Sequence, residues 1–178
     1  MNNKYYSFLF AIGFLLLTAV PALAEQKLAV VNIQQIMRES KAAASVRDQM
    51  KAKQKTFQEE LDKREKQLQS EDQDLAKQRS VLAQDAFEKK YKEFREKAAD
   101  AQKEVRTKRN ALDKGFTQAL TDIQKKVTDI VTAVAKEKNI NAVVSSSPML
   151  YFSPDMDITA EVLTRLNSQM PNLTVKFE

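Results

Sequence analysis

The sequence contains no cysteine, no histidine, only two glycines and four prolines among its 178 residues. Without cysteine there is no disulfide framework, no thiol chemistry and no cysteine for lipid attachment. Without histidine, the commonest general base and the commonest metal ligand are missing. The chain also has no glycine-rich phosphate loop and no G-x-S-x-G motif. We therefore expect that the protein is not an enzyme and uses no cofactor and no metal.

Carboxylates alone could still form an active site, and two acidic pairs, Glu59/Glu60 and Asp72/Asp74, invite that interpretation. Helix neighbours one or two positions apart do not face each other, however. Both pairs also lie among lysines and glutamines, which is typical of a solvated surface.

Glycine and proline are completely absent from residues 22–114, a stretch rich in Ala, Glu, Lys, Gln, Arg and Leu. Almost nothing there stops a helix. Strand-like segments flank the helical region at residues 27–31 and 141–145. One unbroken helix of about 100 residues would hold them about 150 Å apart, where they could not pair. We therefore predict a helical hairpin over residues 39–139 with its tip near 80–86, where Ser80 or Asp85 could cap the returning helix.

The first 24 residues have the pattern of a secretory signal peptide. A weakly positive start at Lys4 is followed by an apolar run at residues 8–20 and by a small-x-small cleavage site, Ala22-Leu23-Ala24. A membrane anchor is the alternative, but the run is shorter than the ~20 residues that span a bilayer. We expect cleavage after Ala24 and export of a soluble protein.

The two predicted arms carry unequal apolar stripes. In the first arm the leucines at 61, 68, 75 and 82 recur every seven residues without a regular apolar partner, which predicts a thin seam. The second arm has a fuller stripe with 3,4 spacing, which begins with aromatics and is interrupted at Lys108. Its members are Phe87, Tyr91, Phe94, Ala98, Ala101, Val105, Leu112, Phe116, Ala119, Ile123, Val127, Ile130 and Val134.

The remaining residues, 25–38 and 140–178, predict a small discontinuous β-rich body, so the fold class is α+β. We expect strands at 27–31, 141–145 and 149–152, a short helix at 157–167 capped by Asp157, and a strand or loose tail at 173–177. Asn32 can cap a helix whose buried face continues into the first arm. Three or four short strands and one helix bury little surface, which favours oligomerisation through the body.

Positive charge is concentrated in the arms. Residues 41–138 contain 24 Lys and Arg against 18 Asp and Glu, whereas the rest of the chain after residue 24 has 4 against 6. A basic surface favours acidic partners, namely nucleic acid, anionic lipid or anionic protein segments. Ordinary solvation of a mixed-charge helix is the alternative for most of the individual residues.

Taken in order, these segments resemble the Skp (OmpH) family of periplasmic chaperones. The resemblance rests on the Ala-Leu-Ala cleavage site, on KLAVVNIQQIM at 27–37, on the charged hairpin, and on NINAVVSSSPMLYFSPDMDITAEVLTRLN at 139–167. It implies a homotrimer in which a β body carries three hairpins around a cavity. It also implies ATP-independent holding of unfolded outer-membrane β-barrel proteins. Residues 170–178 form a longer tail than the family pattern leads us to expect, and the sequence assigns it no role.

Site residues follow from this resemblance together with the stripes. Client-contact candidates are Met50, Phe57, Phe87, Tyr91 and Phe94, although these side chains could instead join the two arms. Basic-face candidates, which would favour acidic clients, anionic lipid or lipopolysaccharide, are Lys89, Lys90, Lys92, Arg95, Arg106, Lys108 and Arg109; solubility is the alternative.

Gly115 lies within the apolar stripe, where a helical glycine costs about 1 kcal/mol relative to alanine. It marks either a hinge or a close packing contact.

Two other functional classes remain. An adaptor hairpin that binds no client should have full apolar layers on both arms, and the first arm has half of one. A nucleic-acid binder fits the sequence pI of about 9.3, but the predicted export and the absence of an aromatic stacking platform argue against it. We expect no nucleic-acid partner.

Overall fold

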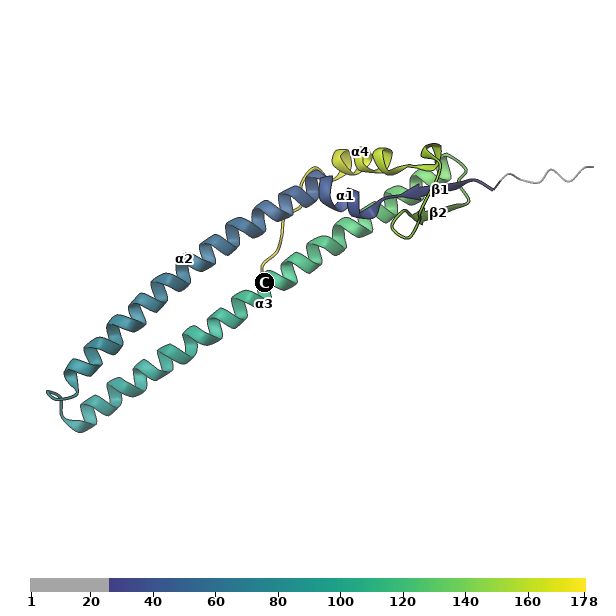
Figure 1. The fold of residues 1–178 in the computed structure, drawn as a ribbon. Coiled ribbons are helices and arrows are strands. Elements are labelled where there is room, and N and C mark those ends of the chain that lie inside the picture. Colours follow the sequence, from purple (N-terminus) through teal and green to yellow (C-terminus); the bar gives the residue numbers. More distant parts are fainter. Residues whose placement is uncertain (1–25) are drawn as a thin grey trace, which may run out of the picture.

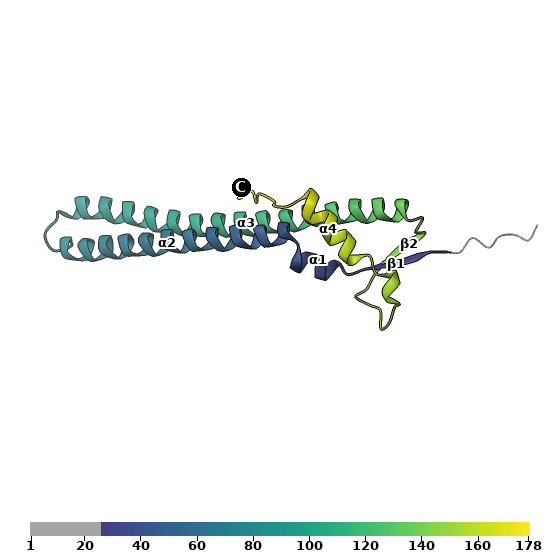
Figure 2. The same cartoon turned by 90° about the horizontal axis from the view of Figure 1, so that it is seen from above.

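The computed structural model describes residues 26–178, so the predicted signal peptide lies outside the described residues. Two long antiparallel helices project from a small body; the described chain begins in this body, and its C-terminus lies farther along the hairpin, beside α3 (Figure 1; Figure 2). This confirms the predicted α+β class. In chain order the elements are β1 (Leu28–Val31), α1 (Ile33–Glu39), α2 (Lys41–Gln78), α3 (Gln84–Glu137), β2 (Ala142–Ser145), the 3-10 turn η1 (Pro154–Met156) and α4 (Thr159–Gln169).

The hairpin reverses at residues 79–83 without glycine or proline. α2 has 38 residues and α3 has 54, lengths of about 57 Å and 81 Å at 1.5 Å per residue. The predicted caps at the tip are wrong, because the N-cap of α3 is Ala83, which makes no side-chain hydrogen bond. Asp85 lies instead in the first turn of α3, where its negative charge interacts favourably with the positive end of the helix dipole.

The body contains a two-stranded parallel sheet. β1 pairs with β2 in register from Leu28↔Ala142 to Val31↔Ser145, and a single bridge joins Val30 to Asp157. The predicted strand at 149–152 is wrong. The chain turns there, with the Met149 amide donating to the Ser146 carbonyl at 3.0 Å, and residues 149–152 pair with neither of the two described strands. The described residues therefore form fewer strands than the three or four expected.

A break at Ser40 separates α1 from α2, where the sequence pattern predicted one continuous helix. Ser40 is fully buried and extended (φ −67°, ψ 145°), and its hydroxyl accepts from the Ala43 amide at 3.2 Å. Asn167 of α4 accepts from the next free amide, that of Lys41, at 2.8 Å. Side chains therefore satisfy two orphan N–H groups of α2, and the break lets α1 turn back along the body.

α3 ends at Glu137, and Asn139 closes the end of the helix in place of the usual glycine. Asn139 has a positive φ of 54°; the Ile140 amide donates to the Ala135 carbonyl at 2.8 Å and the Asn139 amide to Lys136 at 3.4 Å. This pair of bonds is the Schellman motif, and asparagine tolerates the left-handed conformation it requires. The motif returns the chain directly into β2, beside β1.

α4 begins two residues later than predicted, at Thr159, with Ile158 as its N-cap. The Asp157 side chain still accepts from the Thr159 amide, at 2.8 Å. The Thr159 hydroxyl in turn accepts from the Asn32 amide at 2.8 Å. This polar link fastens the start of α4 to the junction of β1 and α1.

Ion pairs hold the outer side of α4 against the end of α3. Arg165 donates to both carboxylate oxygens of Glu137, at 2.8 and 2.5 Å, and to Glu161 at 2.8 Å. The hydrogen bond from Arg165 lowers the pKa of Glu137, and the bond from Lys138 lowers the pKa of Glu161. Because Glu137 is exposed and Glu161 is only half-buried, water screens these pairs, and they mainly orient α4.

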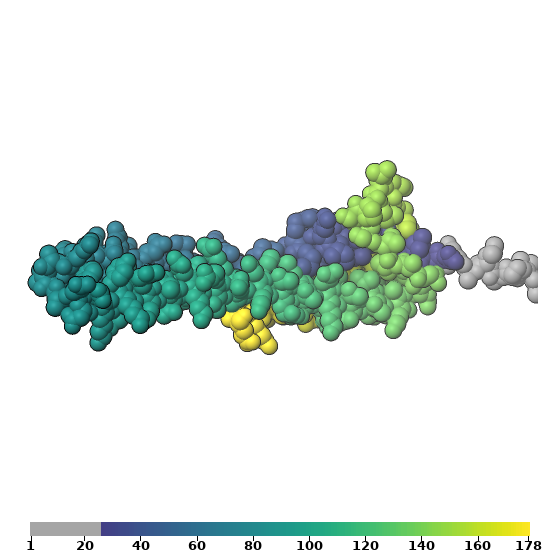
Figure 3. All heavy atoms as spheres, turned by 90° about the horizontal axis from the view of Figure 1, so that it is seen from below, coloured from purple at the N-terminus to yellow at the C-terminus, as the bar shows by residue number. Residues whose placement is uncertain are grey.

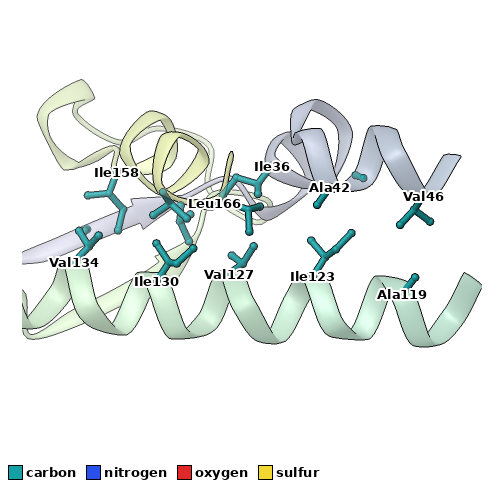
Figure 4. Close-up of a cluster of buried hydrophobic side chains, with 14 of the residues drawn as sticks. Ile36, Ala42, Val46, Ala119, Ile123, Val127, Ile130, Val134, Ile158 and Leu166 are labelled. Carbon is teal, nitrogen blue, oxygen red and sulfur yellow. The ribbon is translucent and has the colours of Figure 1, made fainter. Parts of the chain in front are cut away.

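The hydrophobic core lies at the root of the hairpin. A single stripe on α3, from Ala119 through Ile123, Val127 and Ile130 to Val134, faces the other elements in turn (Figure 4). The side chains packed on it from these elements are Ala29, Val31, Ile36, Ala42, Ala43, Val46, Ile158, Val162, Leu166 and Val175.

Because side chains are less buried toward the tip than at the root, removing side chains of similar size at the two places should lower the free energy of unfolding by different amounts. Ile123→Ala removes a fully buried side chain and should lower the free energy of unfolding by about 2–5 kcal/mol. Leu68→Ala removes a half-buried one and should cost about 1 kcal/mol. Urea unfolding followed by circular dichroism measures both, and equal costs would contradict the gradient.

Candidate functional site

The seam between the arms is thin along most of its length. The heptad leucines at 61, 68, 75 and 82 are all half-buried, as are the facing residues Phe87, Phe94, Ala98 and Val105. Within residues 57–112, only Ala101 and Leu112 are buried; their exposed fractions are 9% and 8%. Because so little apolar surface is withdrawn from water, the arms are held together weakly relative to the root.

Polar contacts supplement the seam. Lys97 of α3 pairs with Glu71 of α2 at 2.9 Å, and Lys90 donates to Gln78 at 2.7 Å. Such exposed pairs are worth about 0–1 kcal/mol each. They set the register of the arms without locking them together.

Lys108 connects the two arms through several polar contacts. Its ammonium group pairs with Glu60 across the seam and with Glu104 on its own helix at 2.8 Å. It also lies 5.7 Å from the centre of the Phe57 ring. Hydrogen bonds to the two carboxylates raise the pKa of Lys108, and the bond from Lys108 lowers that of Glu104. The interruption in the apolar stripe is therefore a cross-arm contact.

The five predicted client-contact residues occupy different environments. Met50 packs against the body core, and Phe57 lies under Lys108. Phe94 lines a cleft of about 230 Å³ between the arms. Phe87 and Tyr91 stack with ring centres 6.1 Å apart, and Tyr91 is 47% exposed. The arm-joining alternative thus describes Met50, Phe57 and Phe94 well, whereas Tyr91 offers surface to a partner.

The basic-face residues also divide. Lys90 and Lys108 make the contacts between the arms given above. Lys89, Lys92, Arg95, Arg106 and Arg109 are exposed. At about 100° per residue, Lys92, Arg95 and Arg106 fall within about 60° of one another on α3. These three form the basic side of the arm that is turned away from the seam.

Gly115 touches the C-terminal tail, residues 170–178, which runs from α4 to α3 (Figure 1) and whose yellow end stands out beside α3 in Figure 3. A Cβ built on Gly115 would lie 2.5 Å from the Lys176 carbonyl oxygen and 3.1 Å from Val175 Cγ1. Only a glycine lets the tail backbone approach this closely. The structure therefore favours the packing interpretation of Gly115.

The sequence patterns did not predict two groups of exposed apolar side chains. Val81 at the tip is 80% exposed, and Leu150 and Tyr151, in the loop between β2 and η1, are 106% and 82% exposed. The predicted strand concealed the loop residues, because a strand would have buried alternate side chains. The signal available was the neighbouring Pro148 and Pro154, which indicate a loop.

Comparison with known proteins now identifies the family. The model of the family described as "Outer membrane protein (OmpH-like)" matches residues 27–166. The chain belongs to the OmpH-like family. The Chaperone protein Skp of Blochmanniella pennsylvanica is 27% identical over 92% of this chain and 99% of its own. An uncharacterized protein of Aquifex aeolicus is 29% identical over 78% of this chain and 85% of its own.

A crystal structure from Caulobacter crescentus CB15, described as a candidate OmpH-like outer membrane chaperone, shares the fold. It has a TM-score of 0.78 and 19% identity, and the match covers 87% of this chain and 92% of that one. Among residues 26–178, no helix is long and apolar enough to cross a membrane, and no group of three or more acidic side chains could hold a metal ion.

Gly115→Ala tests the packing contact. In the full chain the added methyl group meets the Lys176 carbonyl, so we expect the tail to detach and the gain in helix propensity to be cancelled. In a chain ending at residue 169 the same change should raise the free energy of unfolding by about 1 kcal/mol. Urea unfolding of the four proteins measures the difference, and equal effects in both backgrounds would contradict the contact.

Proposed function

We propose that this protein is an ATP-independent periplasmic holdase that keeps unfolded outer-membrane β-barrel proteins from aggregating. Membership of the OmpH-like family, with the chaperone Skp among its relatives, supports an outer-membrane-protein chaperone role. The observation that carries the holding mechanism is the pair of long arms joined by a half-buried seam. Such arms present surface along their whole length rather than one deep pocket.

The mechanism depends on many weak contacts. Unpaired strands of a barrel protein are apolar on alternate residues and prone to aggregate. Exposed side chains such as Tyr91 and Val81 can each cover part of such a strand without fixing its conformation. Because no single contact is strong, a client can leave without an energy source such as ATP.

The basic side of α3 would act over a longer range. Lys92, Arg95 and Arg106 make no ion pair among the described contacts and stand on the outer side of the arm. Exposed positive charge attracts acidic client segments and anionic lipid, including lipopolysaccharide, within about 8 Å at physiological salt.

A homotrimer formed through the body would complete the cavity. Leu150 and Tyr151 project from the body, and Leu28 and Val144 of the two-stranded sheet are 50% and 41% exposed. A two-stranded sheet with open edges is unstable alone and is normally covered. A second and a third copy of the chain would provide this cover and bring three hairpins together.

The oligomer is tested by charge substitution in the exposed loop. Leu150→Asp/Tyr151→Asp should convert a trimer to monomers when measured by light scattering at micromolar concentration, because charges cannot be buried unpaired in an interface. The matched control Ser147→Asp/Pro154→Asp adds the same charge at exposed positions nearby and should leave the mass unchanged. A trimer that survives Leu150→Asp/Tyr151→Asp would place the interface elsewhere.

The holdase activity is tested with a urea-unfolded outer-membrane barrel protein diluted into buffer with the purified protein. We expect light scattering to be suppressed at one trimer per client. Val81→Ser/Tyr91→Ser should weaken client binding about fivefold, because each of these exposed apolar side chains contributes less than about 1.5 kcal/mol. The control Gln102→Ser/Asn110→Ser, at exposed polar positions of α3, should have no effect.

A failure to suppress aggregation would remove the holdase proposal. A stable oligomer that binds no unfolded client would instead support the adaptor alternative, in which the hairpin spans between partners.

A further inference from the structure

The C-terminal tail lies in a groove at the root of the hairpin as a segment without regular secondary structure, in which buried and exposed side chains alternate. It leaves α4 at Met170 and crosses toward α3 (Figure 1). Leu173, Val175 and Phe177 face the core cluster, with Val175 only 6% exposed, whereas Thr174 and Lys176 are exposed. The described tail thus shows the period of two that characterises a β-strand with one buried face.

The groove holds this segment by its backbone. Gln49 of α2 donates from Nε2 to the Leu173 carbonyl at 2.7 Å, and its Oε1 accepts from the Val175 amide at 3.0 Å. A further bond from Gln49 Nε2 to the Ser45 hydroxyl, at 3.0 Å, orients the amide. The two contacts to residues i and i+2 do not depend on the side chains of the bound segment.

The opposite wall of the groove is equally suited to a backbone. Gly115 presents no side chain where the Lys176 carbonyl approaches. On the α2 wall, which also carries Gln49, Lys53 lies 5.8 Å from the centre of the Phe177 ring, which places a cation over an aromatic side chain. One wall therefore recognises the peptide backbone by hydrogen bonds, and the other allows its close approach.

The groove continues beyond the tail. A cleft of about 270 Å³ lies between the arms next to Phe177, lined among others by Phe57, Lys108 and Leu112. A strand longer than the tail could place its next apolar side chain there. The groove is thus large enough for a segment other than the one that fills it.

We propose that this groove is a binding site for extended chain segments with alternating apolar residues, and that the tail is its tethered occupant. Strands of unfolded barrel proteins have this alternation, so the choice of client rests on the proposed function. The tail competes with the client for Gln49 and for the surface beside Gly115. It covers the site when no client is present.

Tethering determines the strength of this competition. A segment joined by a short linker acts at an effective concentration on the order of millimolar. A free segment binds only the fraction of molecules whose tail has left, and its apparent affinity falls by that fraction. Loosening the tail should therefore increase binding of a free segment without changing the groove itself.

The test uses the full chain and a dye-labelled peptide, MPNLTVKFE, which copies residues 170–178. Val175→Asp places a charge at the buried tail position, so the tail should leave and fluorescence anisotropy should report peptide binding at least tenfold tighter than to the unchanged protein. Thr174→Asp adds the same charge one residue away at an exposed position and should have no such effect. Adding Gln49→Leu to Val175→Asp should remove the gain, as should a peptide with Asp in place of its valine.

A cysteine pair provides an independent route, since the chain has no cysteine of its own. In Lys53→Cys/Phe177→Cys, oxidation should hold the tail down and reduction should release it, with at least a tenfold increase in peptide binding. Helical circular dichroism must match the unchanged protein in both forms.

The proposal is overturned if Val175→Asp, still helical, binds the peptide no better than Thr174→Asp, or if the Val175→Asp tail amides keep their protection from hydrogen exchange. It is also overturned if Gln49→Leu leaves peptide binding intact. Failure of the holdase proposal is distinct: peptide would bind the released groove while an unfolded barrel protein still aggregated. That result would support the groove as a peptide-binding site and would exclude strands of barrel proteins as its ligand.

Discussion

The structure depends on burial of one apolar stripe on the second half of α3. From Ala119 to Val134 this stripe shares one core with side chains of α2, α1, α4 and β1, which come from both ends of the described residues. The parallel pair β1–β2 has four residues on each side, too few to persist in water without such support. Helix–helix and helix–strand burial therefore assembles the body, and the sheet fixes the position of the two chain ends relative to each other.

The same stripe explains why the arms are loosely joined. Beyond the root, α3 packs only on α2, and each heptad supplies a single leucine from the opposite side. Exposed ion pairs such as Lys97–Glu71 cannot replace the missing apolar area. Local stability therefore falls from root to tip, and elements at the low end of that range are those that open first. Because the seam between α2 and α3 is packed sparsely, the arms both leave apolar surface for a client and are free to move around it.

The sequence was sufficient for features with a local cause. The absence of glycine and proline from residues 22–114 predicted the long helices, and 3,4 spacing predicted the buried face of α3. Features that depend on distant partners were not accessible. Residues 149–152 have strand composition but pair with neither β1 nor β2, and Ala83 became an N-cap although it offers no capping side chain. The tail groove joins Gln49, Gly115 and Val175, and Gly115 alone gave a signal, one that hinge and packing interpretations explained equally well.

The contact between Gly115 and the tail makes the hinge and packing interpretations of Gly115 compatible. Glycine is the weakest residue for holding α3 helical, and it lies where the root core gives way to the thin seam. Val175 and Phe177 cover that position while the tail is bound. If the tail leaves, α3 loses packing at its least stable point, so the arm can bend there. An occupant of the groove would restore that packing, and binding at the root would in this way be coupled to the angle of the arm. The glycine that admits the bound segment is then also the position through which the arm responds to it.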